Sequence, residues 1–391
     1  MVDQALRNIF YQNYTGIFEE ELWRATLGEL NKAVDQAFKD AKPGTPDKAM
    51  ANKFKFNNAL FSAYKSANQT QTLKLLKAAG KANTFAEYKK QAAGIVNDYN
   101  NQWLKTEYAS AKARARSAKN WQTAVNNADL YPNIEYLPSI AADPREDHKQ
   151  YYHVVRPIND PFWDSHLPPI SWRCQCQWKT TDAPAKQAPT NLPQPQPGLD
   201  SNPGKTGAIF SQTHNYFDFG NDQAVVKQTI ASMHGKSVND VMLYYMDTKT
   251  KGVVYSFGKM AASERVNNIR TAIVYAKLGN EVYLPSQFDV DSIINGIFNE
   301  FKHPQAVSKS AFFERFYRGM EQFRDRKIIG DQTLHITKDT LKGNILNGLK
   351  NAIHKADAKG FKPVNNVHFI IEDDYQGSVT IAEILTDKLP F

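Results

Sequence analysis

Residues 136–178 read YLPSIAADPREDHKQYYHVVRPINDPFWDSHLPPISWRCQCQW, and this is the most informative stretch of the chain. It crowds proline, histidine, tryptophan and charged residues together without the period of a helix or a strand. Both cysteines of the protein, Cys174 and Cys176, lie at its end. Such a density of special residues predicts a compact, specific loop structure rather than regular secondary structure.

The order of residues in this stretch resembles the phage Mu F-like head morphogenesis family, the minor head proteins of tailed bacteriophages. The resemblance extends over about residues 1–180 and is most specific in the motif. The matching positions are Asp143, Arg145, His148, Asp160, Pro161, Phe162, Trp163, Pro168, Pro169, Trp172, Cys174 and Cys176. Two features depart from the family pattern: residues 151–155 replace a glycine, and Asn159 replaces the first aspartate of the DDPFW step.

This resemblance implies a protein that docks at the phage portal, contacts other head proteins and packaged DNA, and becomes part of the virion. It would be made in the cytoplasm of an infected bacterium. The amino terminus lacks a basic segment followed by an apolar core, and no run of about eighteen apolar residues occurs. We therefore expect no membrane contact.

Length and composition set broad limits. The chain has 391 residues, enough for two or three domains, and its net charge of +8 permits contact with nucleic acid without requiring it. With only two cysteines, spaced too closely for an easy mutual disulfide, no disulfide framework is expected.

We expect a multidomain protein of the α plus α/β class. A helical domain at 1–130 is followed by the Mu F-like motif module at 131–179 and a Pro-rich linker at 180–205. Prolines alternate with polar residues in that linker, a composition that favours an extended spacer. A mixed α/β domain is predicted at 206–391.

The amino-terminal segment reads as helices over 14–39, 47–79 and 84–119, the last opening with a Thr84 and Glu87 capping box. Residues 1–130 hold 19 lysines and arginines against 12 aspartates and glutamates, a difference of +7. A basic run closes the third helix: Lys112, Arg114, Arg116 and Lys119. It is either a solvated helix face or a contact with DNA or an acidic partner.

The motif carries several side chains that could bind a metal: His148, His153, His166, Asp160, Cys174 and Cys176. Thiolates and imidazole suit zinc, and His148 with the two cysteines is the set we name as a zinc candidate. The alternative is a compact loop nest in which Asp143 pairs with Arg145, Trp163 packs with Trp172, and the prolines fix an extended turn. A Cys/His protease is a third reading, but no orienting residue or oxyanion loop can be named.

In the carboxy-terminal domain, Asn295-Gly296 lies between β-branched and aromatic runs, a strong signal for a two-residue hairpin. The resulting register places Ile294 opposite Ile297, Asp291 opposite Glu300, and Asp289 opposite Lys302. Because side chains alternate along a strand, the four charged residues lie on one face. Opposed carboxylates repel, so a positive group should lie with them: Lys302, a divalent metal or another cation.

This Asp…NG…ExK pattern resembles toxin-type nuclease domains, either PD-(D/E)xK metal-dependent nucleases or the barnase, EndoU, colicin and RelE-like RNases. In the first version Asp291 and Glu300 would hold Mg²⁺ and Lys302 would stabilise the scissile phosphate of DNA or RNA. In the second, Lys302 and His303 would act without metal on an RNA 2′-hydroxyl. The alternative is a charged cluster on a solvated sheet face.

Three functions are thus compatible with the sequence. The first is a structural minor head protein, the second a head protein that also delivers a nuclease, and the third a cytoplasmic nucleic-acid-binding protein. The modest charge and the lack of a helix-turn-helix or zinc-finger signature argue against the third.

Overall fold

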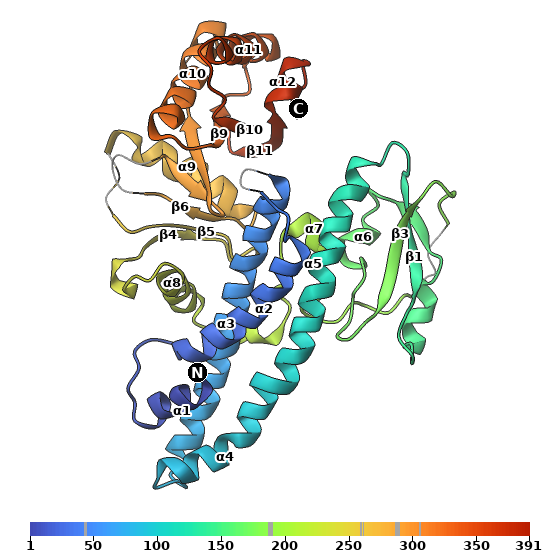
Figure 1. Ribbon diagram of the computed structural model, residues 1–391, viewed down its shortest axis with the longest axis vertical. Coiled ribbons are helices and arrows are strands. Elements are labelled where there is room, and N and C mark those ends of the chain that lie inside the picture. Colours follow the sequence, from blue (N-terminus) through green and yellow to red (C-terminus); the bar gives the residue numbers. More distant parts are fainter. Residues whose placement is uncertain (43–44, 187–190, 259, 261, 286–289, 305) are drawn as a thin grey trace. The chain divides into compact units, whose positions relative to one another are not determined.

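The computed structural model in Figure 1 describes residues 1–42, 45–186, 191–258, 260, 262–285, 290–304 and 306–391. They form two compact units, residues 1–40 with 53–238 and residues 41–52 with 239–391. The sequence indicated a boundary after residue 205, whereas the second unit takes up the chain after residue 238. Helices dominate the first part of the chain and a large sheet the last, in keeping with a mixed helix and sheet class.

The amino-terminal region is helical, as predicted, and further short helices that were not predicted follow it up to residue 238. The helices are α1 (Val2–Phe10), α2 (Glu20–Ala37), α3 (Pro46–Ala78), α4 (Phe85–Asn97), the π-helical turn η1 (Asp98–Trp103), α5 (Leu104–Asn126), η2 (Glu146–Tyr151), α6 (Phe162–Ser165), α7 (Pro203–Thr206), η3 (Asn215–Phe219) and α8 (Asp222–Met233). The predicted helix over 84–119 is therefore two α-helices joined by η1. The capping box of Thr84 and Glu87 is confirmed.

The amino-terminal helices share one apolar core. Leu6 of α1, Leu22 of α2, Leu73 of α3 and Tyr88 of α4 are all buried in it. Because burial of apolar surface drives helix packing, these residues explain why short helices such as α1 are stable here.

The motif forms a small module built on a three-stranded antiparallel sheet. Its strands are β1 (Asn133–Ser139), β2 (Val155–Pro157) and β3 (Cys176–Thr181), in the order β2-β1-β3. Tyr136, Trp163 and Ile170 form its core together with Trp121 of α5. Figure 1 shows these strands beside α5, in green. The expected loop structure thus surrounds a sheet that the sequence did not reveal.

The Pro-rich segment after the module packs against it rather than hanging free. The backbone N–H of Gln196 donates to the carbonyl oxygen of Ile170 at 2.8 Å, and the Tyr151 hydroxyl donates to the carbonyl oxygen of Pro193. Leu199 is fully buried. The segment is extended, as its composition predicts, but its described residues after 190 belong to the first unit. Residues 187–190 lie outside the described part.

The second unit contains an eight-stranded mixed sheet of order β11-β10-β9-β8-β7-β6-β5-β4. The strands are β4 (Met242–Met246), β5 (Val253–Ser256), β6 (Glu281–Tyr283), β7 (Ser292–Ile294), β8 (Ile297–Lys302), β9 (Gly330–Ile336), β10 (Val364–Ile371) and β11 (Asp374–Thr380). The helices are η4 (Val238–Asp240), α9 (Ala262–Lys277), α10 (Lys309–Arg326), α11 (Lys342–Ala358) and α12 (Ile381–Leu385).

Helices cover both faces of this sheet. Phe369 of β10 packs with Phe316 of α10 and Leu349 of α11, whereas its neighbour Ile370 packs with Tyr275 of α9. Since successive residues of a strand point to opposite faces, α9 lies on one face and α10 and α11 on the other. This arrangement decides which helix each polar residue of the central strands meets.

The predicted hairpin is confirmed. Ile294 pairs with Ile297, and Asn295 and Gly296 both have positive φ, 47° and 78°, as a two-residue type I′ turn requires. Ser292 pairs with Asn299, so the next step of the register brings Asp291 to Glu300. Asp289, expected opposite Lys302, lies outside the described residues.

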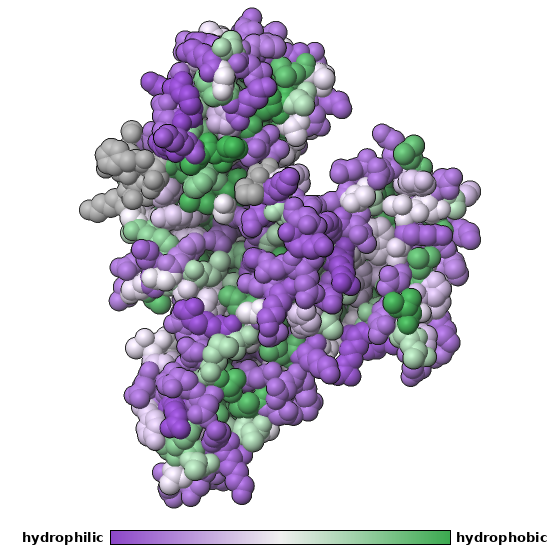
Figure 2. Space-filling view, in the orientation of Figure 1, coloured by the Kyte–Doolittle hydropathy of each residue, from purple (hydrophilic) through white to green (hydrophobic). Residues whose placement is uncertain are grey.

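The visible surface is mostly hydrophilic, with small separate hydrophobic patches (Figure 2). Within the described part of the chain, no helix combines the length and the apolar character needed to cross a membrane.

Candidate functional site

The Asp-Pro-Phe-Trp step of the motif is a tight turn that leads into α6. Oδ1 of Asp160 accepts a hydrogen bond from the backbone N–H of Phe162 at 2.8 Å, and Oδ2 pairs with Arg156 at 2.6 Å. Pro161 precedes the first residue of α6, and Trp163 is fully buried. Asp160 therefore forms an Asx turn and an ion pair, which accounts for this step without a metal.

Side chains of helix α5 bind the carbonyl oxygens of the two consecutive prolines, Pro168 and Pro169. The hydroxyl of Ser117 donates to the carbonyl oxygen of Pro168 at 2.7 Å, and Nη1 of Arg114 donates to that of Pro169 at 3.2 Å. The peptide bond between the two prolines is cis. The prolines thus mark the place where the module docks on α5.

Arg114 is the centre of this docking contact and is fully buried. Its guanidinium also donates to the carbonyl oxygens of Ile209 at 2.6 Å, Leu199 at 2.9 Å and Ser201 at 2.7 Å. Burial lowers the pKa of Arg114 to about 9. One side chain therefore ties α5 to the motif and to the segment that follows it.

This result corrects the interpretation of the basic run at the end of α5. Arg116 is exposed, but Arg114 faces the interior, and Nζ of Lys119 donates to the carbonyl oxygen of Ala37 at 3.3 Å. Because Arg114 is buried, neither predicted interpretation, a solvated helix face or a contact with DNA, applies to it. Its partners are four backbone carbonyl groups, which no sequence pattern reveals, and the hydroxyl of Ser201.

Two expected pairings within the motif have different partners in the structure. The exposed Arg145 donates from Nη2 to the carbonyl oxygen of Trp172 at 3.2 Å rather than pairing with Asp143. Trp172 stacks on Phe210 with ring centroids 5.9 Å apart, whereas Trp163 lies in the module core. The motif tryptophans therefore stabilise two separate contacts.

His148, Cys174 and Cys176 come together inside the module. Nδ1 of His148 lies 3.5 Å from Sγ of Cys174 and 3.5 Å from Sγ of Cys176. The three potential ligand atoms lie within 4.8 Å of one another. Nε2 of His148 is 3.1 Å from the hydroxyl oxygen of Ser171.

The environment favours a negative charge on one of the two thiols. The hydrogen bond from Cys176, together with the neighbouring His148, lowers the pKa of Cys174. The buried Tyr136 lies beside both cysteines, and burial followed by their charges raises its pKa. A hydrogen bond between the Tyr136 hydroxyl and Cys176 adds to this shift.

The other two histidines of the motif lie elsewhere. Nδ1 of His153 is 2.8 Å from Oε1 of Glu135, on the surface, and Nδ1 of His166 is 2.7 Å from the hydroxyl oxygen of Ser165. The structure thus selects His148 from the three candidates. The sequence could not make this selection, because the distance from histidine to cysteine depends on how β1 and β3 pair.

In the second unit, Lys302 lies between the two predicted carboxylates. Its Nζ is 2.7 Å from Oε2 of Glu300 and 3.4 Å from Oδ2 of Asp291, and it donates to Oε1 of Gln322 at 2.8 Å. Nη1 of Arg326 lies 3.6 Å from Oε1 of Glu300. Gln322 was not predicted, although its four-residue spacing from Arg326 puts both on one face of α10.

This cluster is buried. The alternative interpretation, a charged cluster on a solvated sheet face, is therefore wrong. Glu300 is 1% exposed and Lys302 is 8% exposed. Burial raises the pKa of Glu300 to about 7; Lys302 opposes this shift and the Asp291 charge adds to it. Oε1 of Glu300 accepts no hydrogen bond from any described residue. A carboxyl group of this kind can hold a proton or bind a cation.

His303 belongs to the opposite face of the sheet. Its Nε2 is 2.8 Å from the hydroxyl oxygen of Thr271 on α9, which is 2.8 Å from Nδ1 of His335. Burial lowers the pKa of His303 to about 4, and the neighbouring His335 adds to this shift. Lys302 instead contacts Gln322 of α10. The side chains of Lys302 and His303 therefore do not meet at one site.

Comparison with known proteins gives one informative match. The chain is 25% identical over 157 residues to "Putative capsid assembly protein F" of Escherichia phage Mu. The match covers 32% of this chain and 35% of the phage Mu protein, so it spans about a third of each. No protein family model and no solved structure matches the chain.

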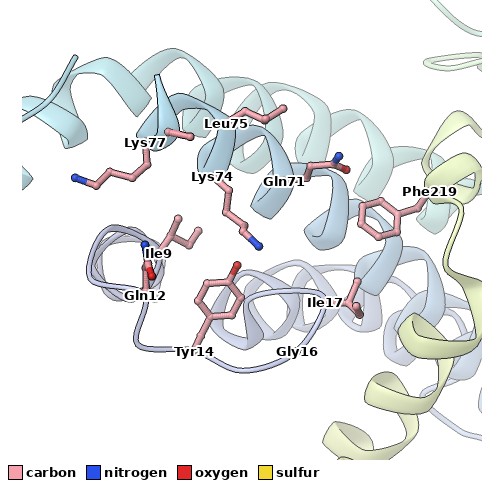
Figure 3. Close-up of a pocket in the computed structure, with 11 residues that line it drawn as sticks. Ile9, Gln12, Tyr14, Gly16, Ile17, Gln71, Lys74, Leu75, Lys77 and Phe219 are labelled. Carbon is pink, nitrogen blue, oxygen red and sulfur yellow. The ribbon is translucent and has the colours of Figure 1, made fainter. Parts of the chain in front are cut away.

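A further cavity of about 830 Å³ lies in the first unit, between α1, the loop that follows it, and α3. Figure 3 shows Lys74 and Tyr14 pointing toward each other across it. Nζ of Lys74 lies 5.9 Å from the ring centroid of Tyr14, and Nζ of Lys77 lies 3.7 Å from that of Phe10. The lining includes these two lysines and no carboxylate among the residues described, so it suits an anionic group.

Proposed function

We propose that this protein takes part in the assembly of a bacteriophage head, where its first unit binds other head proteins at the portal. The observation that carries the proposal is the similarity to the capsid assembly protein F of phage Mu. The order of residues in the motif supports the same role. The protein would be made in the bacterial cytoplasm and incorporated into the virion.

The contacts of the motif support a docking role for the first unit. Arg114 and Ser117 fix the module on α5, and Trp172 fixes it on the segment around Phe210. A module held at several points can present its surface in one orientation, which lowers the entropy lost on binding a partner. The lysine-lined cavity offers a place for an acidic group of that partner.

The experiment is a binding assay between the full chain and the head and portal proteins of the phage that encodes it. We expect a stable complex, and we expect the double charge reversal Lys74→Glu and Lys77→Glu to weaken it by at least tenfold. Lys90→Glu, an exposed lysine outside the cavity, is the matched control and should leave binding unchanged. Failure to bind any head or portal protein would contradict the proposed role.

A second function, a metal-dependent nuclease in the second unit, is favoured by the buried cluster around Lys302. Asp291 and Glu300 would hold Mg²⁺, and the orphaned Oε1 of Glu300 fits such a group because a carboxylate oxygen is a preferred magnesium ligand. A bound magnesium ion would supply the Lewis acid and an activated water at the scissile phosphate. The metal-free version is disfavoured, because Lys302 and His303 face opposite sides of the sheet.

The residues of the chain have distinct roles in this proposal. Asp291 and Glu300 orient the cation, and Lys302 turns from its carboxylate partners toward the phosphate as negative charge develops there. Arg326, 3.6 Å from Glu300, provides a second positive charge for the nucleic-acid backbone.

The test uses the full chain with RNA and with duplex DNA, in Mg²⁺ and in EDTA. We expect cleavage that needs the metal and falls at least a hundredfold in Glu300→Gln and in Lys302→Met. Glu314→Gln, an exposed carboxylate of α10, is the matched control and should keep full activity. Equal cleavage in EDTA would exclude the metal role, and no cleavage of either substrate would leave the cluster as a structural ion pair.

A further inference from the structure

The thiol and imidazole groups of the module have the spacing of a metal site. In a tetrahedral zinc centre the Zn–S bond is about 2.3 Å and the Zn–N bond about 2.0 Å, which puts nitrogen and sulfur about 3.5 Å apart. Nδ1 of His148 lies 3.5 Å from each of the two sulfur atoms. A single ion could therefore contact all three without a large movement of any side chain.

The histidine ring is oriented for this role by its second nitrogen. Nε2 lies 3.1 Å from the Ser171 hydroxyl oxygen, so the hydroxyl can accept the Nε2 proton and leave Nδ1 unprotonated toward the sulfurs. Metal-bound histidines commonly have such a partner on the other nitrogen. The backbone carbonyl oxygen of Ser171 also accepts a hydrogen bond from the backbone N–H of Cys174 at 3.0 Å, so one residue positions two of the three ligands.

The surrounding framework is built to hold these groups still. Cys176 begins β3 and pairs with Ser139 of β1, next to an irregularity in the register. Arg173 has a φ of 64°, a left-handed conformation that turns the chain just before Cys174. His148 is 3% and Cys176 is 5% exposed, while Cys174 is only half-buried. The ligands are thus preorganised, with one side of the group toward solvent.

A second observation also points to a ligand at this place. The Tyr136 hydroxyl is buried beside the two cysteines and forms a hydrogen bond with Cys176. A hydroxyl in this position can donate to a metal-bound thiolate, as the groups around metal ligands commonly do. Plain core packing gives no reason to bury two thiols, an imidazole and a hydroxyl together.

We propose that His148, Cys174 and Cys176 bind one zinc ion that stabilises the module, with a water molecule in the fourth position on the solvent side of Cys174. The pair Cys-x-Cys alone would be a weak zinc signal, and the third ligand comes from a distant part of the chain. Two thiolates and one imidazole form a donor set that zinc prefers. The site is independent of the proposed role in head assembly and of the nuclease proposal.

The test is the metal content of the purified full chain, measured by elemental mass spectrometry after growth with added zinc. We expect close to one zinc per chain, and less than a tenth of that in the double variant Cys174→Ser and Cys176→Ser and in His148→Gln. His153→Gln, which changes an exposed histidine of the same motif, is the matched control and should retain the metal. Ser171→Ala should weaken zinc binding by about 10- to 100-fold while leaving all three ligands in place.

A spectroscopic measurement on the unchanged protein covers the case in which the cysteine variants fail to fold. X-ray absorption at the zinc edge should show two sulfur ligands and at least one nitrogen ligand. A shell of oxygen and nitrogen atoms alone would overturn the proposal, as would the absence of zinc from the wild-type chain. Copper in place of zinc, with the same sulfur ligands, would overturn the identity of the ion.

Discussion

The carboxylate cluster of the second unit and the thiol and imidazole cluster of the first are assembled in different ways. Asp291, Glu300 and Lys302 belong to one hairpin, so a two-residue turn suffices to bring them together. His148 and Cys174 are 26 positions apart and meet only because a sheet and a helix fold around them. Local spacing therefore predicts the first cluster directly, whereas the second depends on contacts across the whole module.

The strongest test of this comparison is the substitution Arg114→Met. It removes the donor of hydrogen bonds to four buried carbonyl groups, and we expect the free energy of unfolding of the first unit to fall by about 3–5 kcal/mol. Arg116→Met on the same helix removes only an exposed charge and should change it by less than about 0.5 kcal/mol. Denaturant unfolding of both variants measures the difference. Equal effects would mean that long-range contacts of Arg114 do not hold the module.

A second test concerns the buried acid of the hairpin. The pKa of Glu300 in the folded chain is raised to about 7, above its ordinary value of 4.5, so the folded state binds this proton more tightly. Wild-type stability should therefore fall as pH rises from about 4.5 to about 7, and Glu300→Gln should lack this loss. The difference should reach about 3 kcal/mol, at about 1.4 kcal/mol per pH unit.

The measurement for Glu300 is the unfolding of wild type and variant at pH 5 and at pH 8. A stability difference that stays constant between these two values would show that Glu300 is not buried in an apolar environment. Glu314→Gln again serves as the control, because an exposed carboxylate of α10 should show no such trend.

The smallest expected effect is at the turn itself. Asn295 adopts a φ of 47°, accepts the backbone N–H of Glu281 at 3.0 Å and donates to Oδ1 of Asn280 at 2.8 Å. Asn295→Ala should cost about 1–2 kcal/mol, because alanine disfavours this backbone conformation and makes neither hydrogen bond. Asn295→Gly separates the two causes, since glycine accepts the conformation. If both variants cost the same, the side-chain hydrogen bonds alone account for the effect.

Much of the second unit could be predicted because its signals are local. The turn at Asn295-Gly296 predicts the register of β7 and β8, which the structure confirms. The strand β11 was not predicted: its sequence DYQGSVT contains Asp and Gly, which strands disfavour, and it is held by its neighbour β10.

The first unit shows why composition alone misleads. The prolines of residues 180–205 predict an extended spacer, but β3 runs to Thr181, α7 begins at Pro203, and the described part of the chain between them also lies along a surface that offers hydrogen bonds. Gln196 and Leu199 show that it does so here, which no local pattern records. Likewise, Arg114 reads as one more charge on a basic helix. Its burial depends on carbonyl groups brought together by the fold.

The partners of Arg114 have a consequence for how this sequence can change over evolutionary time. The guanidinium binds the carbonyl oxygens of residues 169, 199, 201 and 209, which every amino acid possesses. Positions 169, 199 and 209 can therefore exchange side chains as long as the path of the backbone is kept, whereas the Ser201 hydroxyl also accepts a hydrogen bond from Arg114. Position 114 has no such freedom, since a lysine lacks the forked donors. Divergent relatives should retain an arginine there while the segments that it binds lose recognisable similarity.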